Sequence, residues 1–178
     1  MKKVLLVLIG FLILSACSFT SSPSTKAEEY ISRYTSLNED VIQDLETTVA
    51  SENLSTSNKE TYKEVLKRQY KDIKYTVKDE EINGDNATVT MKITVYDLYK
   101  SDKQSLDYLN LHNEEFYENG LINQEKYDSY KINNMLSTNE TVDYEIKMYL
   151  NKENGTWLVQ EVDKETLLKI HGLYNYEG

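Results

Sequence analysis

One stretch alternates strictly between apolar and polar side chains, and this limits the folds open to the chain. One side of the stretch carries Ala87, Val89, Met91, Ile93 and Val95, and the other carries Thr88, Thr90, Lys92, Thr94 and Tyr96. A period of two predicts a β-strand with one buried face and one solvent face, which is typical of an antiparallel sheet. The turn residues Asn83-Gly84-Asp85-Asn86 predict a hairpin with a preceding strand over 73–82.

A second hairpin is predicted near the C-terminus. Val142, Tyr144, Ile146, Met148 and Leu150 alternate in the same way, residues 151–155 form the turn, and Trp157 and Val159 return. Four strands in two hairpins would bury one common face.

Helical spacing of apolar residues fills the rest of the chain. A capping box at Thr25–Glu28 predicts a helix that continues to Val49 or breaks near Asn38. Further helices are predicted from Ser57 to Ile73, from Ser101 to Glu118 with Gly120 as its end, over 123–136, and from Asp163 to a stop at Gly172. The expected fold is α+β: an antiparallel sheet of two hairpins packs against N-terminal helices, with a helical insertion between the hairpins.

The N-terminus has the pattern of a secretory signal peptide. Two lysines precede an apolar run over 4–14 and the small residues Ser15 and Ala16. The run is shorter than the about 20 residues that a membrane-spanning helix needs. Leu14-Ser15-Ala16-Cys17 resembles a bacterial lipobox. This resemblance implies that residues 1–16 are removed, that Cys17 receives a diacylglyceryl thioether, and that the protein is lipid-anchored at the outer face of the cell membrane.

The residues that follow predict a tether and then a single domain. Residues 17–26 comprise the lipidated cysteine and a Ser/Thr-rich stretch that predicts a flexible tether, and residues 27–178 suit one α+β domain. Without Lys2 and Lys3, 18 basic side chains face 30 acidic ones, so the net charge is −12. Such a surface disfavours nucleic acid and anionic lipid heads.

Several stretches resemble a group of uncharacterised lipoproteins of Firmicutes, which are Gram-positive bacteria. They are YKEVLKRQYKDIKY (62–75), NGDNATVTMKITVYDL (83–98), 154–162 and KIHGLYNYE (169–177). The hairpins, and NGTWLV in particular, also resemble the cone-shaped nuclear transport factor 2-like fold. That second resemblance implies a pocket between sheet and helix, but no single activity.

No motif of metal or nucleotide chemistry emerges from the sequence. Asp79-x-Glu81-x-Asn83-Gly84-Asp85 matches the first half of a calcium loop, but Thr90 stands where a bidentate glutamate is required. His112 and His171 lie far apart and have no cysteine partner, so no zinc site is expected. The sequence also has no phosphate-binding loop and no dinucleotide fingerprint. We therefore expect no metal and no cofactor.

One set of residues is a candidate ligand pocket. The buried stripe of residues 87–95 continues in phase to Asp97. A carboxylate at the mouth of an apolar pocket holds its proton tightly and suits acid–base chemistry. Tyr75, Tyr144 and Trp157 are the polar-tipped aromatics expected near Asp97. In the alternative arrangement, Asp97 ends the strand in water and the aromatics belong to the core.

Three functions remain open at this level. The first is a non-enzymatic surface domain that binds a small molecule or an envelope protein. The second is an enzyme of the isomerase or dehydratase type, with Asp97 as its acid–base group. The third is an interaction protein whose core is filled and lacks a pocket.

Overall fold

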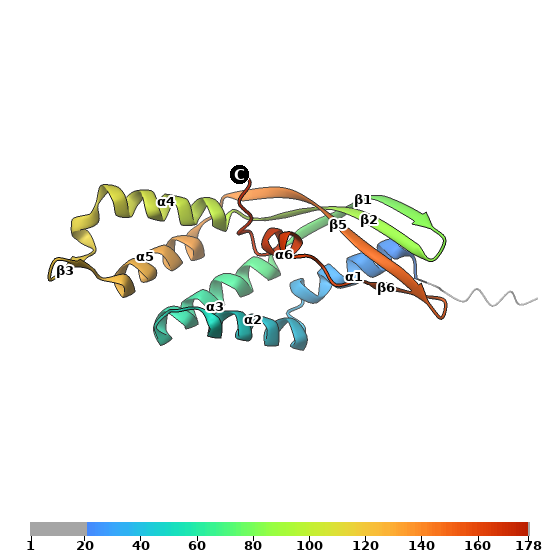
Figure 1. The fold of residues 1–178 in the computed structure, drawn as a ribbon, viewed down its shortest axis with the longest axis horizontal. Helices are drawn as coiled ribbons and strands as arrows, with labels where there is room; N and C mark the ends of the chain where they lie inside the picture. The colour runs from blue at the N-terminus through green and yellow to red at the C-terminus, as the bar shows by residue number, and fades with distance from the viewer. Residues whose placement is uncertain (1–20, 178) are drawn as a thin grey trace, which may run out of the picture.

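The computed structural model describes residues 21–177 and has the α+β architecture that the sequence predicts (Figure 1). The signal peptide and Cys17 lie outside these residues. The elements in chain order are α1 Pro23–Thr35, α2 Glu39–Ser51, α3 Thr56–Lys71, β1 Lys74–Asn83, β2 Asn86–Tyr96, α4 Leu98–Leu111, the 3-10 turn η1 Asn113–Glu115, β3 Tyr117–Glu118, β4 Leu121–Ile122, α5 Gln124–Ser137, β5 Thr141–Glu153, β6 Thr156–Val159 and α6 Lys164–Ile170.

The main sheet is antiparallel, with strand order β1-β2-β5-β6. The two predicted hairpins therefore join through β2 and β5, which pair from Asn86↔Asn151 to Tyr96↔Thr141. The predicted alternation is confirmed, because all five apolar residues of β2 are buried and β5 buries every second residue from Tyr144 to Leu150. The buried face of the sheet carries much of the core.

The N-terminal helical region is two helices before α3, separated near Asn38. Leu37 at the break has a φ of 50°. The first helix begins at Pro23, two residues before the expected capping box. The Ser22 hydroxyl accepts from the Thr25 amide at 3.1 Å, and Pro23 occupies a first-turn position, where proline is favoured. Residues 23–26 of the expected flexible tether are thus helical. They are fixed to the sheet, because the Ser24 amide donates to Glu80 at 2.8 Å.

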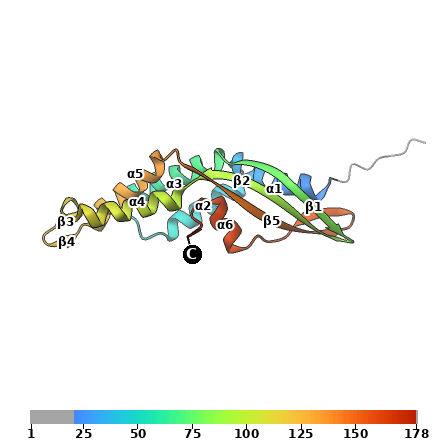
Figure 2. The same cartoon turned by 90° about the horizontal axis from the view of Figure 1, so that it is seen from above.

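The insertion between the hairpins forms a two-helix arm, consisting of α4, η1, β3, β4 and α5 (Figures 1 and 2). The prediction of one helix from 101 to 118 is wrong at both ends. Asp97 caps α4 four residues before Ser101, where the helix was expected to begin, and α4 ends at Leu111. Gly120 does not terminate a helix. Asn119 and Gly120 have φ of 52° and 82° and form the two-residue turn of a small hairpin, β3–β4, at the arm tip.

The molecule is elongated (Figure 1). In both views the described chain begins at one end of the long axis, and the arm tip lies at the opposite end (Figures 1 and 2). The C-terminus lies between these ends, beside α6 (Figure 1). Among residues 21–177, no helix combines the length and the apolar character that crossing a membrane requires.

The C-terminal segment is fixed against α3 and β2. The predicted cap of α6 is confirmed, because Asp163 accepts from the Thr166 amide at 2.7 Å. The predicted stop at Gly172 is also confirmed, with φ of 70°. Gln69 of α3 joins the layers: its Nε2 donates to the carbonyls of Tyr96 and Ile170, both at 3.3 Å.

Candidate functional site

Asp97 is buried, with 6% of its surface exposed, and both of its carboxylate oxygens hold structural hydrogen bonds. Oδ1 accepts from the Lys100 amide at 2.9 Å and so caps α4. Oδ2 accepts from the Tyr176 hydroxyl at 2.9 Å. Loss of solvation and this hydrogen bond raise the pKa of Tyr176 to about 12. Asp97 thus joins the start of the arm to the C-terminal segment.

Tyr75 and Tyr144 lie in one row across the sheet, on either side of Ile93. Tyr144 is buried, and its hydroxyl lies 3.4 Å from the Tyr174 carbonyl oxygen. Its ring packs edge-on against that of Tyr174, with centroids 5.8 Å apart. Burial raises the pKa of Tyr144, and the nearby charge of Asp97 adds to this. Tyr144 and Asp97 therefore share one neighbourhood, with Tyr75 on the same face of the sheet.

Trp157 does not share these surroundings. It pairs with Lys152 on β5, eight residues from Tyr144, which is roughly 26 Å at about 3.3 Å per residue. Its neighbours belong to α1: Trp157, Tyr30 and Arg33 line one shallow depression of about 280 Å³. The four residues expected to line one pocket are thus divided between the two ends of the sheet.

The tip of the arm exposes a group of large apolar side chains. Leu111 is 77% and Leu121 75% exposed, and Tyr117 and Ile122 are more than two-fifths exposed. We call these four residues the tip surface. Tyr117 and Ile122 lie opposite each other in the β3–β4 hairpin, whereas Leu121 pairs with Glu118 and points to the other face. The segment around them, residues 104–125, holds five carboxylates and no lysine or arginine. The carboxylates are Asp107, Glu114, Glu115, Glu118 and Glu125. One lysine, Lys126, also reaches this end of the arm, where its Nζ donates to the Glu115 carbonyl at 2.5 Å, so the surroundings of the tip are negative on balance.

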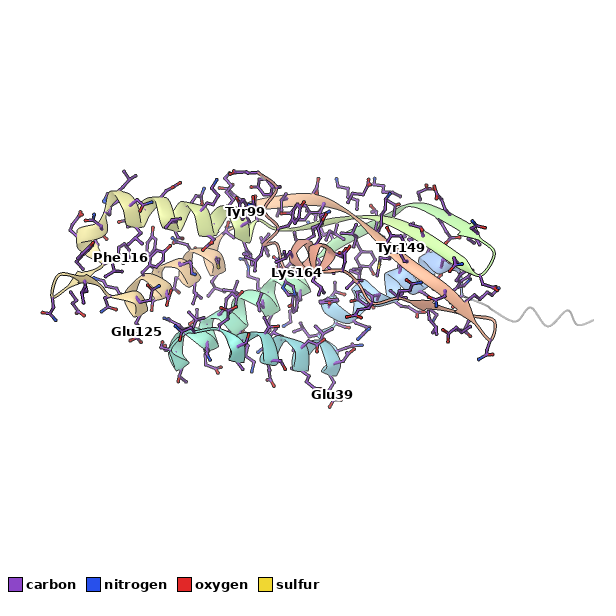
Figure 3. All side chains as sticks on the ribbon, in the orientation of Figure 1. Glu39, Tyr99, Phe116, Glu125, Tyr149 and Lys164 are labelled. Atoms are coloured by element: carbon purple, nitrogen blue, oxygen red, sulfur yellow. The ribbon has the colours of Figure 1, made fainter. Side chains whose placement is uncertain are left out.

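Behind the tip surface, aromatic rings pack the two helices of the arm together. Phe116 is buried at the arm end, near the start of α5 at Glu125 (Figure 3). Its ring meets those of Tyr127 and Tyr130 at 5.8 and 5.4 Å, and Tyr130 stacks on Tyr108 at 4.8 Å. Edge-to-face and stacked rings of this kind stabilise a fixed arrangement. The tip is a supported surface and not an isolated loop.

The described residues contain no group of three or more side chains arranged to hold a metal ion. Comparisons with family models, with curated proteins and with solved structures gave no match.

The tip surface was missed from the sequence although a signal was present. Asn119-Gly120 is a strong hairpin signal, and it stands between Tyr117-Glu118 and Leu121-Ile122. The helical pattern of the preceding residues predicts a helix to Glu118, and this helix would cover the first strand of the hairpin. Two apolar residues that follow a hairpin turn inside an acidic segment are a sign of an exposed apolar tip.

Proposed function

We propose that this protein is a lipid-anchored, extracytoplasmic interaction protein that presents the arm tip to a basic protein of the cell envelope. The observation that carries the proposal is the tip surface, where Leu111 and Leu121 are each at least three-quarters exposed. Large apolar side chains gathered at one exposed place mark interaction sites more often than scattered ones do.

The position of the tip supports an outward-facing role. A lipid on Cys17 would hold the end of the molecule at which α1 begins. The tip lies at the other end of the long axis (Figure 1). An anchored molecule of this shape would carry its apolar tip away from the bilayer, where other envelope proteins can reach it.

The charge around the tip selects the kind of partner. Five carboxylates in residues 104–125 outnumber the one lysine beside them, Lys126, and this excess favours a partner surface rich in lysine and arginine. A second copy of this chain would bring the same negative charge against itself. The proposal therefore names a basic protein surface with an apolar centre.

The enzyme alternative gains no support from Asp97. An acid–base group must reach a substrate, and both oxygens of Asp97 instead accept hydrogen bonds from Lys100 and Tyr176. The core also buries its polar groups in pairs, since no buried side-chain polar atom of the described residues lacks a partner.

Photo-crosslinking in living cells tests the proposal. A photoreactive residue replaces Leu121 at the tip, and in a control it replaces Tyr149, which is 52% exposed on β5 (Figure 3). We expect one discrete adduct with a basic envelope protein from position 121 and none from position 149. Substituting Glu114→Lys and Glu115→Lys together is expected to abolish that adduct. Equal adducts from both positions, or an adduct indifferent to charge reversal, would rule the proposal out.

A further inference from the structure

A separate feature lies at the base of the arm, where a cavity of about 200 Å³ opens between α3, α4, α5 and the C-terminal segment. This volume has room for about seven water-sized groups at roughly 30 Å³ each. Its apolar wall consists of Leu54, Ile132, Met135 and Leu173. Ile132 and Met135 are buried residues of the core. The cavity thus reaches from solvent to the interior.

Tyr62 of α3 brings a polar group into this apolar wall. Tyr62 is only 9% exposed, yet within residues 21–177 its hydroxyl has no hydrogen-bond partner. Among the described residues, every fully buried polar side-chain atom has a hydrogen-bond partner. Because the Tyr62 hydroxyl has none, it is not fully buried, and it faces the cavity that Tyr62 lines. A largely buried hydroxyl that opens into a cavity is able to hydrogen-bond a guest.

The charges at the cavity rim are unbalanced. Glu52, Asp102 and Lys131 all line it, which leaves one net negative charge. Lys131 Nζ forms a long ion pair with Asp102 Oδ1 at 3.9 Å, beyond hydrogen-bonding distance, so the Asp102 carboxylate retains acceptor capacity. Burial raises the pKa of Tyr62 to about 12, and the carboxylates of Glu52 and Asp102 add to this effect. The Tyr62 hydroxyl and the carboxylates of Glu52 and Asp102 are therefore close enough to influence one another electrostatically.

We infer that this cavity is a binding site for a small amphipathic cation, an ammonium group on a short alkyl chain. The chain would lie against the apolar wall, and the ammonium group would donate to the Tyr62 hydroxyl oxygen and to Asp102. An anion of the same shape would meet the carboxylates at the rim and be repelled. This site is independent of the tip surface, so it stands even if the tip binds nothing.

Methionine methyl NMR tests the site on the full chain in detergent micelles, with hexylammonium as the probe. The chain has four methionines. Met135 lines the cavity, whereas Met91 and Met148 are fully buried in the sheet core and act as internal controls. Substituting Met135→Leu identifies its resonance. We expect hexylammonium to shift the Met135 methyl saturably and to leave the other two in place, while hexanoate shifts none.

Two substitutions examine the polar contacts. Tyr62→Phe removes only the hydroxyl, and Asp102→Asn removes only the charge. Each is expected to weaken hexylammonium binding by about tenfold, the effect of losing one hydrogen bond to a charged group. The matched controls Tyr149→Phe and Asp107→Asn change exposed residues elsewhere and should leave the affinity unchanged. A Met135 methyl that does not respond, an equal response to hexanoate, or variants that bind like the wild type would overturn the inference.

Discussion

Gly172 occupies the tightest backbone position among the glycines of the described chain. A Cβ atom there would lie 2.2 Å from the Tyr96 carbonyl oxygen and 2.4 Å from Gln69 Nε2. Its φ of 70° also disfavours any other residue. We predict that Gly172→Ala lowers the free energy of unfolding by about 3 kcal/mol, because strain and a disrupted Gln69 bridge act together. Urea denaturation of both proteins measures the difference.

The control is Gly84→Ala in the β1–β2 turn. Gly84 has a similar φ of 61°, but nothing lies within 4 Å of its would-be Cβ atom. The substitution should therefore cost only the backbone strain, about 1 kcal/mol. Equal losses at the two glycines would show that the close approach at Gly172 contributes nothing.

His171 makes the fold sensitive to mild acid. Its Nε2 lies 3.0 Å from the Tyr70 hydroxyl, and burial lowers the pKa of His171 to about 4. The unfolded chain takes up this proton near pH 6.5, so the neutral form stabilises the fold above that pH, and the contribution falls as the pH drops toward 4. We predict a loss of about 2 kcal/mol in the free energy of unfolding between pH 7 and pH 5.

The comparison is with His171→Asn, which removes the titrating ring. Urea unfolding at pH 7 and pH 5 should show a smaller loss for His171→Asn than for the wild type. His112→Asn serves as the exposed counterpart, with its side chain 45% exposed, and should retain the full pH dependence. If all three proteins lost the same stability, His171 would not be the titrating group.

At the scale of elements, the sequence predicted strands better than helix ends. Alternation in β2 and β5 indicates both the strand and its buried face, because one residue of slip would expose every apolar side chain. The sequence patterns place the starts of the helices less accurately. Ser22, Ser55 and Asp97 cap α1, α3 and α4, although capping-box patterns occur a few residues later in each case. Contacts with other parts of the fold determine which of several nearby residues caps a helix. A local sequence pattern contains no information about those contacts.

Asp97 tests this view of α4. Asp97→Ala removes both the cap of the arm and the hydrogen bond from Tyr176. At about 1 kcal/mol for each, we predict a loss of about 2 kcal/mol in the free energy of unfolding, measured by urea denaturation.

The conservative partner of that substitution is Asp97→Asn. Asparagine caps helices as well as aspartate does, and its amide can reach the Tyr176 hydroxyl. It should cost about 0.5 kcal/mol at most. If Asn were as damaging as Ala, the negative charge of the carboxylate, and not only its hydrogen-bond geometry, would stabilise this junction.

At the scale of the whole molecule, separation along the long axis explains why the candidate site could not be assembled from the sequence. Asp97 and Trp157 both continue or complete alternating strands, so both were expected on the buried face. The buried face of the sheet is long. The alternation of a strand indicates which side chains lie on that face, but not which parts of two strands lie side by side. Trp157 packs near α1, while Asp97 packs near the C-terminal segment. A site built from residues far apart in the sequence depends on where each residue lies in three dimensions. Alternation along a strand gives the face on which a residue lies, but not which distant residues lie beside it.

The same axis yields a prediction about orientation on the membrane. Cys17 is the one cysteine of the chain, and a lipid would occupy its thiol, so an introduced cysteine can be labelled selectively. Asp85→Cys marks the β1–β2 turn. That turn lies at the end where α1 begins, because Ser24 is hydrogen-bonded to Glu80 in the same hairpin (Figure 2). Leu121→Cys marks the arm tip.

We predict unequal energy transfer from these two positions to acceptor lipids, once the lipid-anchored protein is reconstituted in vesicles. Transfer should be strong from position 85 and weak from position 121. Anionic vesicles should not draw the tip inward, since a net charge of −12 on residues 17–178 opposes contact with their surface. Strong transfer from position 121 in neutral vesicles would mean that the apolar tip lies in the membrane, and an envelope protein would then no longer be its partner.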